Sequence, residues 1–95
     1  MEIGRYLVLG TVHVSMKTAE LLDGWALVEP ASRPLGVAST HYGWFIPTRQ
    51  VEGPDRLAIP DELLAAMALG RGLNCDYLLF DCDACAIDEL PTFPW

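Results

Sequence analysis

The chain has 95 residues, 52% of them hydrophobic, and a formal net charge of −7 at pH 7. This length and apolar content suit one folded domain over residues 1–95 and exclude an intrinsically disordered chain. The negative charge argues against direct binding of nucleic acid, and the apolar runs fall far short of the roughly 20 residues that span a bilayer.

The first part of the chain predicts a strand, a helix and a second strand. Residues 5–14 are rich in β-branched and aromatic side chains, which is typical of strands. Ser15 is a suitable N-cap for a helix over Met16–Leu22, and Gly24 stands where a glycine often ends a helix. The short apolar stretch Trp25–Val28 then predicts another strand.

The middle of the chain predicts two strands, a loop and a second helix. The strands are expected over Leu35–Thr40 and Tyr42–Ile46, and residues 48–59 are expected to form an exposed loop. Pro60 followed by two acids is a strong helix start, because proline suits the first turn and negative charge favours the helix dipole. This helix is predicted to end near Gly72.

The last part predicts a strand over Tyr77–Phe80 and a return strand over Ala84–Ile87, paired as a hairpin. The aromatic tail after Leu90 is expected to pack against the domain. The whole order predicts an α+β fold, with a mostly antiparallel sheet of about four to six strands and two helices on one face.

The charge is uneven along the chain. Residues 1–50 carry four acids and four bases, whereas residues 51–95 carry nine acids and only two bases, Arg56 and Arg71. Such a field favours contact with a basic surface. The acids expected to bind the partner are Asp61, Glu62, Asp76, Asp81, Asp83, Asp88 and Glu89.

One aromatic residue joins these acids as a predicted contact. Trp44 and Phe45 are adjacent, so in a half-buried strand one of them must point away from the core. An exposed Trp44 or Phe45 beside acids would be a plausible binding hot spot. Which of the two is exposed stays open at this stage.

The stretch from Asp81 to Cys85 resembles parts of a catalytic motif and of two kinds of metal site, but the residues around it do not complete any of the three. An Asp-Cys-Asp sequence after a strand is the local pattern of haloacid-dehalogenase phosphotransferases, but only twelve residues follow Asp83 and the chain has a single lysine. A calcium loop starting at Asp81 would need a glycine where Ala86 stands. Cys82 and Cys85 lack the second ligand pair of a zinc site, and His13 and His41 are expected to be structural. We therefore predict no metal and no cofactor.

Several segments together resemble a small uncharacterised domain of plasmid, prophage and other mobile-element proteins. The segments are His13-Val14-Ser15, Leu21-Leu22-Asp23, Tyr42-Gly43-Trp44-Phe45, Pro60-Asp61-Glu62-Leu63, Cys75-Asp76-Tyr77-Leu78 and Leu90–Trp95. The resemblance implies no catalytic residue, since that domain has no assigned activity. Small acidic proteins of such elements often resemble anti-CRISPR inhibitors, some of which imitate the phosphates of nucleic acid.

The leading hypothesis is a non-enzymatic inhibitor of the anti-CRISPR kind. It would occupy a basic groove of a host nucleic-acid-binding complex, such as a CRISPR effector, without binding nucleic acid or membrane itself. The alternative is a protein-interaction or oligomerisation module, including a homodimer, that uses the surface of Trp44 or Phe45. A small metal-dependent enzyme is a third possibility. An odd number of cysteines and the lack of a basic, apolar N-terminal signal predict a cytoplasmic location in the host cell.

Overall fold

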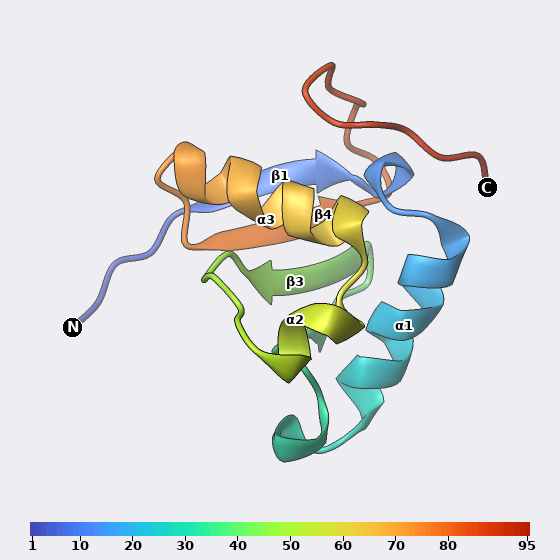
Figure 1. Cartoon of the computed structure of the whole chain (residues 1–95). Helices are drawn as coiled ribbons and strands as arrows, with labels where there is room; N and C mark the ends of the chain where they lie inside the picture. Colours follow the sequence, from blue (N-terminus) through green and yellow to red (C-terminus); the bar gives the residue numbers. More distant parts are fainter.

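The computed structural model describes residues 1–95 and contains one four-stranded sheet. The strands are β1 (Tyr6–Gly10), β2 (Ala38–Ser39), β3 (Gly43–Pro47) and β4 (Tyr77–Asp81). Their order across the sheet is β1-β4-β3-β2 (Figure 1). The pair β1–β4 is parallel, and the pairs β4–β3 and β3–β2 are antiparallel. The sheet is therefore mixed and mostly antiparallel, as predicted.

Two long helices accompany the sheet, α1 (Met16–Leu27) and α3 (Asp61–Gly72). A short helix, α2 (Pro54–Ala58), lies within the segment that was predicted to be a loop, and 3-10 turns occur at Thr11–His13 and Pro30–Ser32. The α+β fold with two main helices is confirmed. No helix of the structure is long and apolar enough to cross a membrane.

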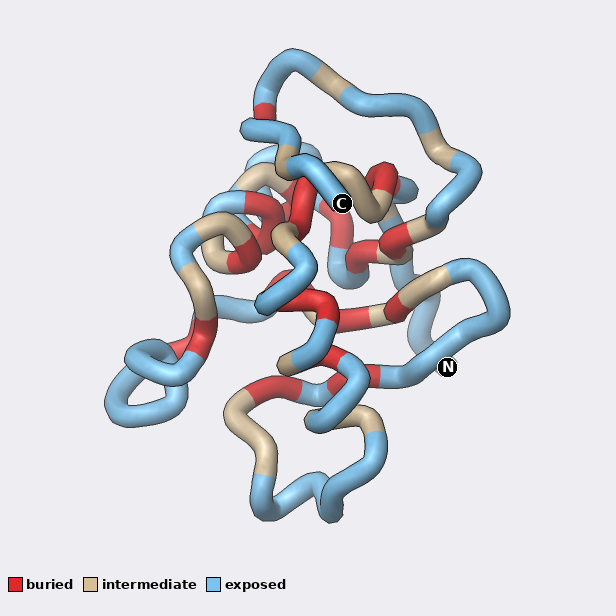
Figure 2. The backbone as a smooth tube through the Cα atoms, turned by 90° about the vertical axis from the view of Figure 1, so that its right-hand side faces the viewer, coloured by how far each residue is buried: buried red, intermediate tan, exposed pale blue.

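Alternation along the strands gives the sheet one buried face. Leu9, Phe80 and Trp44 form one row across β1, β4 and β3, and Ile46 pairs with Leu78 in the next row. These side chains join buried residues of both long helices in one core, which are Ala19, Leu22, Leu63, Ala66 and Met67. Buried stretches run through the middle of the molecule and include loop residues such as Leu35, Val37 and Val51, while the outer turns of the tube are exposed (Figure 2). Both long helices therefore cover the same face.

Helix α1 begins as predicted and ends later. The Ser15 hydroxyl accepts a hydrogen bond from the Thr18 amide at 3.2 Å, so Ser15 is the N-cap. Gly24 does not end the helix, because it does not adopt the positive φ of a glycine C-cap. The prediction of a strand over Trp25–Val28 is wrong: Trp25 belongs to the last turn of α1 and packs against the core.

The return strand over Ala84–Ile87 is also absent, and the sheet order explains why. Both edges of β4 are already paired, with β1 on one side and β3 on the other, so no edge remains for a hairpin partner. The segment that follows β4 instead packs over the end of β1. Its Phe93 amide donates to the Val12 carbonyl at 2.8 Å, and the Trp95 indole donates to the Val14 carbonyl at 3.1 Å. The aromatic tail packs down, as expected.

Candidate partner-binding site

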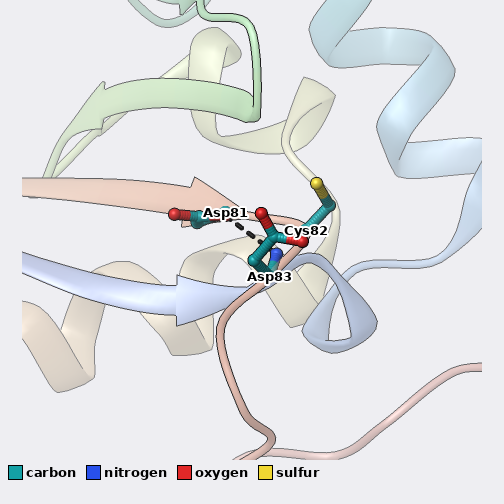
Figure 3. A group of neighbouring side chains, drawn as sticks. All are labelled: Asp81, Cys82 and Asp83. Carbon is teal, nitrogen blue, oxygen red and sulfur yellow. Dashed lines mark hydrogen bonds between the residues drawn. The ribbon is translucent and has the colours of Figure 1, made fainter.

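Two carboxylates and a thiol gather where β4 ends. The side chains of Asp81, Cys82 and Asp83 bring their oxygen and sulfur atoms within 4.8 Å of one another (Figure 3). A carboxylate oxygen of Asp81 accepts the Asp83 amide at 2.8 Å, which fixes the turn. Asp81 is half-buried, and the other two residues are exposed.

This group supplies three donor atoms from consecutive residues. A structural zinc site needs four, usually thiolates and imidazoles. His13 does not provide the fourth, because both of its ring nitrogens are hydrogen-bonded elsewhere. Cys75 is buried, and its thiol contacts the Leu73 carbonyl at 3.8 Å. The arrangement is best described as an exposed acidic turn.

Two more acids lie at the same end of the sheet because His13 holds the segment that carries them. His13 lies in the turn directly after β1 and is buried. Its Nδ1 donates to the Pro91 carbonyl at 2.8 Å, and its Nε2 accepts the Ile87 amide at 3.0 Å. Residues 88 and 89 are tethered between these two bonds. We call the four carboxylates at this end the acidic end; they are Asp81, Asp83, Asp88 and Glu89.

The remaining predicted acids lie elsewhere, so the single acidic face expected from the sequence is divided. Asp76 precedes β4, at the opposite end of the strand, and its carboxylate accepts the Arg5 amide at 2.9 Å. Glu62 is turned inward. It accepts hydrogen bonds from the Ser15 hydroxyl at 3.1 Å and the Thr18 hydroxyl at 2.9 Å, so α3 caps the start of α1. Asp61 is exposed.

Trp44 and Phe45 point to opposite faces of the sheet. Trp44 is only 7% exposed, and its indole donates to the Asp23 carboxylate at 2.8 Å. It is therefore a core residue rather than the exposed anchor considered from the sequence. Phe45 is the residue that points away from the helices and lies between the core and solvent.

Phe45 belongs to an apolar surface that no helix covers. The ring of Phe45 stacks on Tyr77 with centroids 4.9 Å apart and meets Tyr6 edge-on at 6.1 Å. Val8 and Leu79 lie on the same face by strand alternation. Tyr6, Val8 and Tyr77 are 57%, 43% and 39% exposed. We call these five residues the open face.

The sequence pattern did not single out Tyr6 and Tyr77, although each begins a run of alternating residues. Tyr6 precedes the partly buried Leu7, and Tyr77 precedes the buried Leu78, so alternation puts each tyrosine on the face opposite its leucine. The contacts of Tyr6 and Tyr77 with Phe45 depend on the order of the strands in the sheet. The register aligns Tyr6 with Tyr77 and places Phe45 beside Leu79.

A pocket of about 260 Å³ adjoins the acidic end, and Cys82 forms part of its wall. Segments from the end of β1, from α1, from the turn before β3 and from the C-terminus converge there. The rings of Tyr42, Trp44, Trp95 and His41 line it, together with the carboxylate of Asp23. We call this the aromatic pocket. Arg56 and Arg71, the only bases of the second half, line a different depression, along α3.

The model of a family of unknown function (DUF5983), C-terminal domain, matches residues 6–95. The chain belongs to this family. No curated protein and no solved structure matches it. The DUF5983 match begins at the first residue of β1 and therefore includes every strand and helix described above. The function of the chain's surfaces therefore has to be inferred from the residues that form them.

Proposed function

We propose that this DUF5983 domain is a non-enzymatic protein-binding domain whose partner is a basic protein. The observation that carries the proposal is the open face, where Tyr6, Phe45 and Tyr77 contact one another on the uncovered side of the sheet. Clustered aromatic side chains on an exposed surface are typical of binding hot spots, because they offer a large contact area with few rotatable bonds.

The charge distribution supports a basic partner. Asp76 precedes β4 and Asp81 ends it, so carboxylates flank the strand that runs through the open face. The net charge of −7 repels a second copy of the chain and attracts a positive surface. Arginine side chains of such a partner would stack on the aromatic rings and pair with the flanking carboxylates.

The histidines support a role without acid–base catalysis. Both nitrogens of His13 are engaged by backbone groups of the C-terminal segment. His41 is exposed and meets the ring of Tyr42 edge-on at 5.0 Å. Neither histidine is hydrogen-bonded to a serine, threonine or cysteine that it would activate as a nucleophile.

A narrower proposal is an inhibitor of the anti-CRISPR kind. Four carboxylates occur within residues 81–89, and no base follows Arg71. Such a surface would pair with Lys and Arg residues that otherwise hold nucleic-acid phosphates, and binding would then be competitive. The resemblance to mobile-element proteins agrees with this role in a host cytoplasm.

The first test is capture of partners from a host lysate by the tagged chain, with elution in a salt gradient and identification by mass spectrometry. A basic protein released by salt supports the general proposal, and displacement of that protein by DNA or RNA supports the inhibitor. Capture of no basic protein by the folded chain would overturn both.

Two variants then locate the contact on the captured partner. Phe45→Ala with Tyr77→Ala removes aromatic contacts from the open face. Asp83→Lys with Asp88→Lys reverses charge at the acidic end, using residues that are exposed. Glu52→Lys with Asp55→Lys is the matched control, because it makes the same charge change in the segment before α3. We expect at least a tenfold loss of affinity for the first two variants and little change for the control.

A further inference from the structure

We propose that the aromatic pocket binds an arginine side chain. The inference deepens the proposed function, because a basic partner is the natural source of that side chain, but it can be tested with a small molecule alone. It rests on three features of the pocket, which are its aromatic lining, its charge and its size.

The aromatic lining is held in place by hydrogen bonds. The Trp95 indole donates to the Val14 carbonyl at 3.1 Å, and the Trp44 indole donates to a carboxylate oxygen of Asp23 at 2.8 Å. Trp95 is nevertheless 58% exposed and Tyr42 53% exposed, although large apolar side chains usually avoid water. Trp95 and Tyr42 therefore offer exposed aromatic rings beside the buried ring of Trp44, and exposed aromatic rings attract cations.

The charge of the lining also favours a cation. Asp23 uses one carboxylate oxygen for Trp44, so the other is available to a ligand. No lysine or arginine lines the pocket, and its one basic side chain is the imidazole of His41. The carboxylates of Asp81 and Asp83 lie outside the lining, and each has an oxygen within 4.8 Å of the thiol of Cys82, which lines the pocket. A neutral apolar ligand would leave these charges unpaired.

The size of the pocket favours a single side chain as its ligand, and the chemistry of the lining favours arginine. The volume of about 260 Å³ is smaller than the roughly 300–1,000 Å³ of pockets for drug-sized ligands. A guanidinium group is planar, stacks on aromatic rings and donates to a carboxylate at the same time. A lysine ammonium can also donate to the carboxylate, but it is more strongly hydrated and has no planar group to stack on the rings.

The test is a titration of the ¹⁵N-labelled chain with Nα-acetyl-arginine amide, followed by NMR. Saturable shifts are expected for the indole N–H signals of Trp44 and Trp95, while that of Trp25, which does not line the pocket, stays in place. Nα-acetyl-citrulline amide has the same shape without the charge, and we expect it to bind at least tenfold more weakly. Nα-acetyl-lysine amide should fall between them.

Variants confirm the position of the site. Asp23→Asn removes the charge but keeps an oxygen for Trp44, so the fold should persist while arginine binding weakens at least fivefold. Glu20→Gln is the control, since it removes an exposed charge from the same helix outside the pocket. Equal binding of citrulline, or no shift at Trp44 and Trp95, overturns the inference.

The failures of the two proposals are distinguishable. If a basic partner is captured and the arginine probe leaves both indole signals unmoved, the pocket inference is wrong and the protein-binding proposal stands. If the probe binds at Trp44 and Trp95 but the lysate yields no basic partner, the pocket is confirmed and the proposed function is wrong.

Discussion

The hydrogen bonds of His13 indicate which of its ring nitrogens donates and which accepts. The Pro91 carbonyl can only accept, so Nδ1 carries the hydrogen, and Nε2 is then free to accept the Ile87 amide. One buried side chain therefore attaches the C-terminal segment to the end of β1.

Replacing His13 should loosen this attachment. We expect His13→Phe to lower the free energy of unfolding by about 2–4 kcal/mol, because the Ile87 amide and the Pro91 carbonyl lose their partner. Urea denaturation measures the loss, and hydrogen exchange at the Ile87 amide should accelerate. His41→Phe is the control, because His41 is exposed. Equal losses for the two variants would contradict the role assigned to His13.

The neighbours Asp61 and Glu62 offer a second comparison of one residue with another. Glu62→Ala removes the acceptor of the Ser15 and Thr18 hydroxyls and should destabilise the domain by about 1–3 kcal/mol. Asp61→Ala removes an exposed carboxylate one residue earlier and should leave the urea midpoint almost unchanged. A larger effect at Asp61 than at Glu62 would mean that helix-dipole charge outweighs the contact between α1 and α3.

At the scale of single residues, the sequence predicts the chemical class of a side chain better than the face of the sheet or helix to which that side chain points. The alternation rule correctly required one of Trp44 and Phe45 to leave the core. It did not choose between them, because both are large and apolar. The choice follows from pairing, which places Trp44 opposite Phe80 in the buried row. Likewise, the inward turn of Glu62 depends on α1, more than 40 residues away in sequence.

At the scale of elements, two glycines act in opposite ways. Gly24 lies within α1, and a Cβ there would meet no atom within 4 Å. Gly24→Ala should therefore stabilise the domain by about 0.5–1 kcal/mol, since alanine has less freedom to lose on folding. In β3, a Cβ on Gly43 would collide with the Phe80 carbonyl of β4. Gly43→Ala should destabilise the domain by about 3 kcal/mol or more. Thermal unfolding of both variants checks this contrast, and the same sign for both would contradict it.

Elements were predictable where their signals are local. The proline and two acids that precede α3 mark its start, and the apolar run of β4 is bounded by polar residues. The prediction of secondary structure failed where contacts with residues distant in the sequence decide whether a segment forms a strand. Trp25–Val28 has the composition of a strand, but the helical turn places Trp25 against the core. Ala84–Ile87 does not form the expected strand beside β4, because β1 and β3 pair with the two edges of β4.

At the scale of the whole molecule, the negative charge opposes compactness. Screening should therefore stabilise the fold, because the Debye length falls from roughly 30 Å at 0.01 M salt to 3 Å at 1 M. We expect the melting temperature to rise with sodium chloride. Reversing Asp83, Asp88 and Glu89 to lysine changes the net charge by two units each, from −7 to −1, and should reduce that rise. An equal rise in both proteins would show that the salt acts through something other than charge.

The place of β4 between β1 and β3 also bears on how the chain emerges from a ribosome. The two outer neighbours do not touch each other in the sheet, and their shared partner is encoded by residues 77–81. A nascent chain that ends at Gly72 already holds both long helices, yet it lacks the strand that joins β1 to β3. Folding of the domain must therefore wait until residues 77–81 have been translated, and until then the future open face and the future core are equally accessible to chaperones.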